Sequence, residues 1–389
     1  MQDVRRAGPF QASTASSGGS ELLAVREEGG SHARRAGLPP TGAAPVQGHV
    51  TRQVTSQTAT SVHPRDVLLG AQAHTGILPV CDHYSGVEAR MRKSLQLQAE
   101  MTEEFGLCVF DVTLDCEDGA PVGGEADHAQ MVVALALGCS RAARVAVRVH
   151  AVNHPAFSAD MAVVAGHAGH RLTHIMVPKV ESLADVEAAV AALDAAGAPT
   201  LPLHVLIESP TAVHHAFDIA GHPRVQSLSF GLMDFVSSHG GAIPAAAMSS
   251  CGQFSHPLVL RAKLAIASSC HAHGKTPSHC VVTEFTDTTA LTRAARRAAF
   301  EFGYTRMWSI HPHQIRPILA AFAPTQAEIE TATKIIAAAV SSHWAPIRFD
   351  NVLHDRASYR YYWQLLEKAY QTGQLLPAES QRYFAQAVP

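Results

Sequence analysis

Short apolar segments alternate with longer stretches of helical character from residue 63 to residue 322, and this alternation constrains the fold more than any other feature. The segments are mostly apolar on both faces, as parallel strands are when helices cover them. Good helix formers fill the gaps, so the repeating unit is one strand followed by one helix. The predicted strands lie at residues 77–82, 107–118, 144–150, 173–180, 203–209, 227–234, 278–285 and 305–312, and residues 67–71 are a candidate for one more strand before them.

Eight strand–helix repeats over about 250 residues predict an α/β fold, the (βα)8 TIM barrel. A doubly wound open sheet is the alternative, but that fold usually begins with a glycine-rich phosphate-binding turn. No such turn is present in the sequence. The barrel is therefore favoured, and its reacting groups are expected at the C-terminal ends of the strands.

Two segments flank the predicted barrel at 63–322. Residues 1–62 are rich in Ser, Gly, Thr, Ala and Arg, and they cannot bury enough apolar surface to offset the entropy of ordering, so we expect disorder there. Residues 323–389 predict a helical extension, which opens with Thr325 and Glu328 at capping-box spacing. Trp363 and five of the seven tyrosines lie in this extension. So many aromatic side chains predict that it docks, either on its own barrel or on a neighbouring subunit.

The composition is that of an ordinary soluble protein, with 389 residues, 47% hydrophobic and 16% charged residues and a net charge of −3. This near-neutral balance gives no indication of nucleic-acid or anionic-membrane partners. No apolar run approaches the roughly 20 residues of a transmembrane helix, and no signal peptide is visible. The seven cysteines are odd in number and form no CxxC pair. Reduced thiols and a cytoplasmic location are therefore expected.

Two carboxylates close the apolar runs of neighbouring predicted strands, Glu208 at the end of residues 203–208 and Asp234 at the end of residues 227–234. Adjacent parallel strands would present these acids side by side at one edge of the sheet. Oxygen ligands of this kind suit Mg²⁺, which keeps further positions for water and substrate. Taken singly, each acid could instead cap a helix or pair with a base. As a pair at matched strand ends, they predict a metal site.

Arg148 closes the third predicted strand, within the same ring of charged groups. Its guanidinium offers a fork of donors to a carboxylate or to a developing oxyanion. Together with a divalent cation that polarises the carbonyl of a 2-keto acid, it suits making or breaking a carbon–carbon bond. A structural salt bridge from Arg148 to Glu117 or Asp118 is the alternative, and both roles can hold. The other charged groups at predicted strand ends are Asp82, Asp115, Glu117, Asp118, Lys179, Glu181, Glu284, Asp287 and His311.

Six short motifs occur in the order in which they are found in one known family. They are Asp115-Cys116-Glu117-Asp118-Gly119, Val147-Arg148-Val149, Val177-Pro178-Lys179-Val180-Glu181-Ser182, Ile207-Glu208-Ser209, Phe230-Gly231-Leu232-Met233-Asp234-Phe235 and Ile310-His311-Pro312-His313-Gln314-Ile315. Over about residues 75–335, the chain thus resembles the citrate lyase β-subunit and malyl-CoA lyase branch of the HpcH/HpaI aldolase and citrate lyase superfamily.

The resemblance implies a (βα)8 barrel that is usually trimeric or hexameric, with Mg²⁺ on Glu208 and Asp234. It implies that Arg148 and Glu117 are catalytic and that, with Asp118 and Lys179, they contact the substrate. The expected partner is a small carboxylate or acyl-CoA, with neither nucleic acid nor a membrane as a partner. The C-terminal extension would match an element that reaches over a neighbouring active site in relatives.

Two positions depart from the family pattern. His150 stands where the family has an asparagine after the third strand. The family's first strand commonly carries an arginine that binds substrate or thioester, whereas residues 78–86 contain none, and Arg90, Arg92 or Lys93 are candidates to replace it. The second departure concerns recognition of coenzyme A rather than the metal site. Asp118 stands where the aldolase branch has a histidine base, which favours the lyase branch.

The sequence therefore predicts a Mg²⁺-dependent carbon–carbon lyase that cleaves or forms a 3-hydroxy acid or its CoA thioester through a metal-stabilised enolate. A 3-hydroxyacyl-CoA thioesterase or a free hydroxy-acid aldolase on the same metal site are alternatives. A family member that binds a ligand without catalysis is a third.

Overall fold

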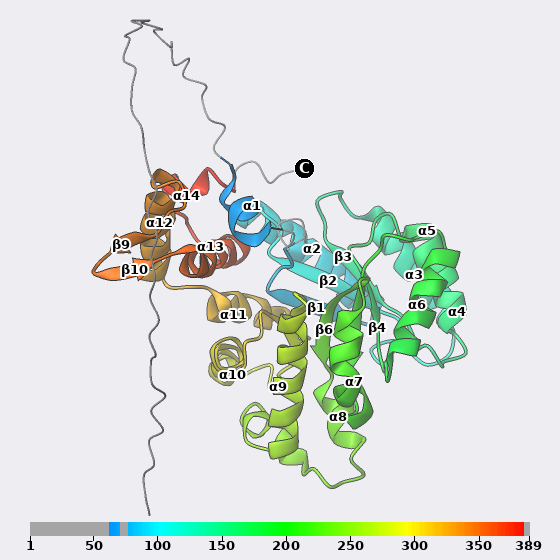
Figure 1. Cartoon of the computed structure of the whole chain (residues 1–389). Coiled ribbons are helices and arrows are strands. Elements are labelled where there is room, and N and C mark those ends of the chain that lie inside the picture. Colours follow the sequence, from blue (N-terminus) through cyan, green and yellow to red (C-terminus); the bar gives the residue numbers. More distant parts are fainter. Residues whose placement is uncertain (1–61, 71–76, 385–389) are drawn as a thin grey trace, which may run out of the picture. The chain divides into compact units, whose positions relative to one another are not determined.

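The computed structural model describes residues 62–70 and 77–384 and contains a closed barrel of eight parallel strands in the order β1 to β8 (Figure 1). The predicted (βα)8 fold is confirmed. The strands are β1 (Cys81–Ser85), β2 (Phe110–Asp115), β3 (Val145–Arg148), β4 (Ile175–Val177), β5 (Leu203–Ile207), β6 (Val225–Phe230), β7 (Thr276–His279) and β8 (Arg306–Ser309). Ring closure joins β1 to β8 through the pairs Cys81–Met307, Asp82–Trp308 and His83–Ser309.

Helices follow the strands and bury the outward-facing Val, Ile and Leu side chains in one continuous core. Several begin with a local signal, such as Ser209, whose hydroxyl accepts a hydrogen bond from the Ala212 amide while Pro210 occupies the first turn. The helical segments around the barrel are α2 (Glu88–Phe105), α3 (Glu125–Gly138), α4 (Phe157–Asp160), η2 (Met161–Ala165), α5 (Gly166–Ala168), α6 (Leu183–Ala195), α7 (Pro210–Gly221), α8 (Leu232–Ser237), η3 (Ala245–Met248), η4 (Gly252–Phe254), α9 (Pro257–Ala272), α10 (Thr288–Glu301) and α11 (Pro312–Phe322).

The barrel interior is layered from the N-terminal to the C-terminal ends of the strands. A charged layer is built around Arg306, which lies 2.9 Å from Asp82 and 2.6 Å from Asp111. Two residues further along the strands, the next inward-facing side chains form an apolar layer, which consists of Tyr84, Met176, Leu206 and Trp308. Above this apolar layer, the strand ends carry the polar groups of the candidate site.

The observed elements correct the predicted limits at three places. The candidate strand at 67–71 is wrong, because residues 67–69 belong to the helix α1 (Pro64–Leu69), which His63 caps through the Arg65 amide, and residue 71 lies outside the described residues. β6 ends at Phe230, so Asp234 lies in the first turn of α8 rather than at a strand end. β7 ends at His279, and Glu284 and Asp287 therefore lie in the connection to α10. In the cases of β6 and β7, the apolar run continues past the last residue that pairs with a neighbouring strand.

The C-terminal extension forms a second apolar core with α1. It comprises α12 (Gln326–Ser341), a hairpin of β9 (Ile347–Phe349) and β10 (Val352–His354), α13 (Arg356–Gln371) and α14 (Ala378–Gln381). The predicted capping box is present, since Thr325 and Glu328 bond reciprocally at the start of α12. Trp363 on α13 is fully buried in this core, and α1 packs against α13. The predicted division at 1–62, 63–322 and 323–389 stays a prediction, and residues 1–61 lie outside the described part.

Among the described helices, none combines the length and the apolar character needed to cross a lipid bilayer.

Candidate active site

Arg148, the last residue of β3, is held at the mouth of the barrel by two carboxylates. Its Nε and Nη2 bond to the two oxygens of Asp115 at 2.7 and 2.5 Å, and its Nη1 lies 3.1 Å from Glu117 Oε2. The guanidinium also lies 5.5 Å from the centre of the Tyr84 ring. Burial lowers the pKa of Arg148, but the Asp115 carboxylate outweighs burial and raises it above its usual value. Arg148 is thus a permanent, oriented cation.

Lys179 joins the same cluster from the turn after β4. Its ammonium contacts Glu117 and lies 3.3 Å from Asp118 Oδ1. Burial lowers the pKa of Lys179, whereas the hydrogen bond to Glu117 and the neighbouring carboxylates raise it overall. The backbone of Lys179 has a φ of 53°, an uncommon conformation for a residue with a side chain. The fold therefore maintains a strained turn that aims this ammonium at the acids of the β2–α3 loop.

Glu208 follows β5 directly and is a buried carboxylate with an unsatisfied oxygen. Its side chain is only 5% exposed, and Oε2 has no hydrogen-bond partner among the described residues. Burial raises the pKa of Glu208 to about 8, and the charge of Asp234 adds to this rise, while Arg148 opposes it. Gly231 leaves the space that Glu208 occupies, because a Cβ there would lie 2.5 Å from Glu208 Cγ.

Asp234 reaches this site from α8, not from a strand. The chain turns at Gly231 after β6, and α8 begins at once, which places Asp234 in its first turn. The prediction of a matched strand end for Asp234 is therefore wrong. The two carboxylates are still near neighbours, because the charge of Asp234 raises the pKa of Glu208. A buried acid with a free oxygen, beside a second acid whose charge opposes its ionisation, fits a hard divalent cation such as Mg²⁺.

The residues chosen from the sequence are thus gathered at one end of the barrel. Glu208 interacts electrostatically with Asp234, Arg148, Glu117 and Lys179, and Lys179 interacts with Asp118. Asp115, which the sequence offered only as one of several strand-end acids, proves to be the main partner of Arg148. The strand alternation that turns Arg148 inward also turns Asp115 inward, because the two are paired across β2 and β3.

A second group of metal-ligand atoms lies deeper, in the charged layer of the barrel. Ligand atoms of Asp82, His174 and His204 lie within 4.8 Å of one another, and all three side chains are buried. Arg306 lies 2.9 Å from the Asp82 carboxylate. Burial lowers the pKa of both histidines, and the charge of Arg306 lowers it further, to about 3 for His204. A neighbouring guanidinium opposes a cation, and imidazole suits zinc better than magnesium. This deeper group therefore suits Mg²⁺ less well than the carboxylates at the mouth do.

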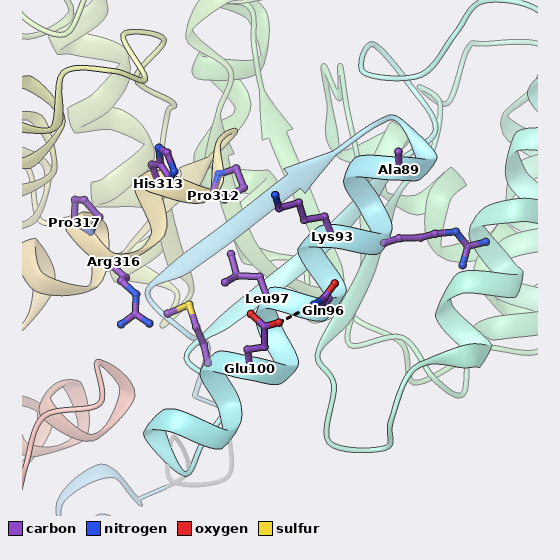
Figure 2. A pocket seen from close by; sticks show the side chains of 11 residues that line it. Ala89, Lys93, Gln96, Leu97, Glu100, Pro312, His313, Arg316 and Pro317 are labelled. Carbon is purple, nitrogen blue, oxygen red and sulfur yellow. Dashed lines mark hydrogen bonds between the residues drawn. The ribbon is translucent and has the colours of Figure 1, made fainter.

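A groove of about 920 Å³ runs between α2 and α11 (Figure 2). Lys93, Gln96 and Glu100 line it from α2, and His313 and Arg316 line it from α11. Arg92 also lines it, although its guanidinium is 2.7 Å from Glu88. Two of the three residues that could replace the family's missing arginine, Arg92 and Lys93, therefore border this groove, which begins beside the connections that follow β1 and β8.

Comparison with known proteins identifies the family of this chain. The sequence model of the HpcH/HpaI aldolase/citrate lyase family matches residues 95–312, more than half of the chain. This chain belongs to the HpcH/HpaI aldolase/citrate lyase family. The predicted family is thus confirmed, and with it the predicted class of enzyme, the carbon–carbon lyases.

Two curated family members illustrate the range of activity. An L-malyl-CoA/β-methylmalyl-CoA lyase of Cereibacter sphaeroides is 31% identical over 243 residues, which cover 58% of this chain and 76% of the relative. A (3S)-malyl-CoA thioesterase of the same species is 33% identical over 165 residues, which cover 42% of this chain and 52% of the relative. Lyase and thioesterase activities thus both occur among relatives of this HpcH/HpaI-family chain.

Two crystal structures share the fold. A protein described as a citrate lyase from Burkholderia xenovorans LB400 is 48% identical, with a TM-score of 0.69 over 83% of this chain and 100% of that one. The CitE protein of Mycobacterium tuberculosis, solved with magnesium, acetoacetate and coenzyme A, is 21% identical, with a TM-score of 0.58 over 75% of this chain and 98% of that one. At that identity, the second likeness concerns the fold alone.

Proposed function

We propose that the chain is a Mg²⁺-dependent lyase that cleaves or forms the carbon–carbon bond of a 3-hydroxy acid or its CoA thioester. The observation that carries this proposal is Glu208, a buried carboxylate with an unsatisfied oxygen and a raised pKa beside Asp234. A divalent cation on these two side chains would relieve the repulsion between them. Bound there, Mg²⁺ would supply Lewis acidity that polarises a carbonyl and stabilises an enolate.

The chain's own residues then divide the remaining work. Asp115 and Glu117 hold Arg148 rigidly through three of its five N–H groups, so the two N–H groups left on Nη1 and Nη2 can donate to the substrate carboxylate or to a developing oxyanion without reorganising. Glu117 ties Arg148 to Lys179 and keeps both cations at the mouth. Lys179, which is 39% exposed, presents its charge to solvent and to an anionic substrate, and Asp118 sets its position. The apolar layer of Tyr84, Met176, Leu206 and Trp308 closes the floor against water from below.

The experiment uses malyl-CoA as the substrate, with Mg²⁺ or with excess EDTA, and identifies the products. A keto acid with acyl-CoA means lyase activity, whereas a free hydroxy acid with CoA means thioesterase activity. Cleavage of free malate alone would indicate a hydroxy-acid aldolase. The proposal expects metal-dependent keto-acid release that Glu208→Gln and Asp234→Asn each abolish. Turnover that survives EDTA and both substitutions would contradict it.

Thioesterase activity is the second candidate, because a curated relative has that name and the same acids can activate water through a metal. The third candidate is a family member that binds ligands without catalysis. In that case, the protein is expected to bind the substrate but to release no product.

We further propose a homo-trimer or homo-hexamer in the cytoplasm. The hairpin of β9 and β10 exposes Val352 by 55% and Leu353 by 73%, and α13 exposes Tyr361 by 59%. An apolar tip of this kind is best explained by contact with another copy. All seven cysteines are free thiols, which supports a reducing compartment.

A further inference from the structure

We propose that His150 is the acid–base group of this enzyme and that Asp160 positions it. The proposal rests on the lyase function proposed above and adds the proton-transfer group that the metal, Arg148 and Lys179 do not supply. It starts from the contacts of His150, a buried histidine just after β3 that is bonded to the buried carboxylate of Asp160.

The backbone directs His150 toward the mouth of the barrel. Val149 continues the strand ladder beyond β3, since its amide donates to Met176 O at 3.1 Å. Side chains alternate along an extended strand, so His150 lies on the same side as Arg148, one step closer to the C-terminal edge. Arg148 is on the inner side, because it bonds Asp115 and lies over the Tyr84 ring.

Asp160 fixes both the orientation and the tautomer of the imidazole. Asp160 Oδ2 accepts from the His150 backbone amide at 3.0 Å and lies 2.6 Å from His150 Nδ1. The Asp160 side chain is 2% exposed, and among the described residues only His150 donates hydrogen bonds to its carboxylate. A carboxylate at this distance calls for a proton on Nδ1, which leaves the lone pair on Nε2.

The Nε2 atom is available for chemistry. His150 is 9% exposed, and none of the described residues hydrogen-bonds to its Nε2 atom. Nε2 is also not one of the side-chain atoms that are both fully buried and without a hydrogen-bond partner. The ring of His154 stacks on His150 with centroids 4.2 Å apart and an interplanar angle of 11°, which holds the imidazole plane in place. A buried acid behind an oriented histidine with one free nitrogen is the arrangement that general bases need.

The proton transfers balance within the lyase reaction. In the cleavage direction, Nε2 takes the proton of the 3-hydroxyl, the O–H electron pair becomes the new C=O bond, and the carbon–carbon pair leaves as the enolate. The Nε2 proton then passes to the enolate carbon and releases the second product. No oxidant or reductant is needed, and the imidazole ends in its starting state.

Other charged groups around His150 shape its pH response. Asp160 faces it from α4, His154 from the connection after β3, and Arg148 from its own strand. Glu125 faces it from the start of α3, since His150 and His154 both lower the pKa of that carboxyl. The acid limb of the pH–rate profile therefore depends on these neighbouring charges as well as on the imidazole itself.

The test compares His150→Asn with His167→Asn as the matched control, because His167 is exposed and neither bonds to nor stacks on His150. At saturating Mg²⁺ and with malyl-CoA, kcat/KM of the wild type is expected to fall on the acid side. His150→Asn is expected to lower kcat about 100- to 1,000-fold and to abolish that acid limb. His167→Asn is expected to keep both kcat and the limb, and Asp160→Asn to shift the limb. The double variant His150→Asn/Asp160→Asn replaces the pair with two neutral amides, so no buried charge is left without a partner. If this variant is folded but inactive, the loss of activity is not a loss of folding.

Two readouts separate this proposal from the proposed function. Nitrogen-edited NMR of the histidine that disappears in His150→Asn is expected to show the Nδ1-protonated tautomer, with or without activity. An Nε2-protonated tautomer, or an active enzyme whose acid limb survives His150→Asn, overturns the role of His150 alone. A wild type without metal-dependent cleavage overturns the proposed function instead.

Discussion

At the scale of single residues, the site is defined by carboxylates in unfavourable surroundings. Glu208 is nearly sealed from solvent and close to Asp234, and its pKa rises to about 8. A buried acid with an unsatisfied oxygen destabilises the metal-free protein, and a cation bound there, as proposed, would offset this cost.

This pKa predicts how metal binding and stability depend on pH. Because the folded-state pKa of Glu208 lies above its usual value of 4.5, ionisation in the metal-free fold costs stability as pH rises from 4.5 to about 8. Apparent Mg²⁺ affinity is expected to rise about tenfold per pH unit below pH 8 and to level off above it. Calorimetric titrations from pH 6 to 9 measure this. Glu208→Gln is expected to weaken binding at least about 10- to 100-fold and to remove the slope. A slope that persists in Glu208→Gln would assign it to another group.

From the sequence, it could be predicted that the candidate residues lie at one end of the barrel, but not how each of them is held there. Glu208, Arg148, Glu117 and Lys179 lie together because each follows a strand closely, and parallel strands end at one edge. The pairing of His150 with Asp160 could not be predicted, because Asp160 lies on a short helix whose position depends on tertiary packing.

At the scale of elements, the β6–α8 connection determines where Asp234 lies in the proposed metal site. The strand was expected to run to residue 234, but Gly231 ends it and lets α8 start immediately. An apolar run cannot show where pairing stops, since strand and buried helix share the same composition there. The glycine also leaves room for Glu208.

Gly231→Ala is therefore expected to impair metal binding more than folding. The new Cβ would lie 2.5 Å from Cγ and 2.7 Å from Oε1 of Glu208, so the carboxylate must move. We expect about a tenfold or greater loss of Mg²⁺ affinity, with a loss of about 1–3 kcal/mol in the free energy of unfolding. Gly138→Ala is the matched control, because nothing lies within 4 Å of a Cβ at that helical position. Equal Mg²⁺ affinity in both variants would contradict this account.

At the scale of the whole molecule, the C-terminal helices and α1 form a second core beside the barrel core. The aromatic content of the tail predicted that it docks on its own barrel or on a neighbouring subunit. Trp363 and Tyr359 are fully buried, but they lie in the core that the extension forms with α1. The contribution of α1 could not be predicted, because residues 64–69 are too few for periodicity to distinguish a helix from a strand.

The apolar hairpin tip predicts self-association. The wild type is expected to sediment with at least three times the chain mass of 41.4 kDa. The double variant Val352→Lys/Leu353→Lys places two charges on the exposed tip and is expected to sediment with the mass of a monomer. Val122→Lys serves as the control, since Val122 is fully exposed in the β2–α3 loop. A wild type that sediments as a monomer would refute the proposed oligomer.

The most direct test of the central claim is anomalous diffraction from crystals of the full chain soaked in Mn²⁺, which substitutes for Mg²⁺ on oxygen ligands. The account predicts one strong peak bound by carboxylate oxygens of Glu208 and Asp234, close to Arg148. A peak at Asp82, His174 and His204 instead, or no peak at the mouth of the barrel, would contradict it.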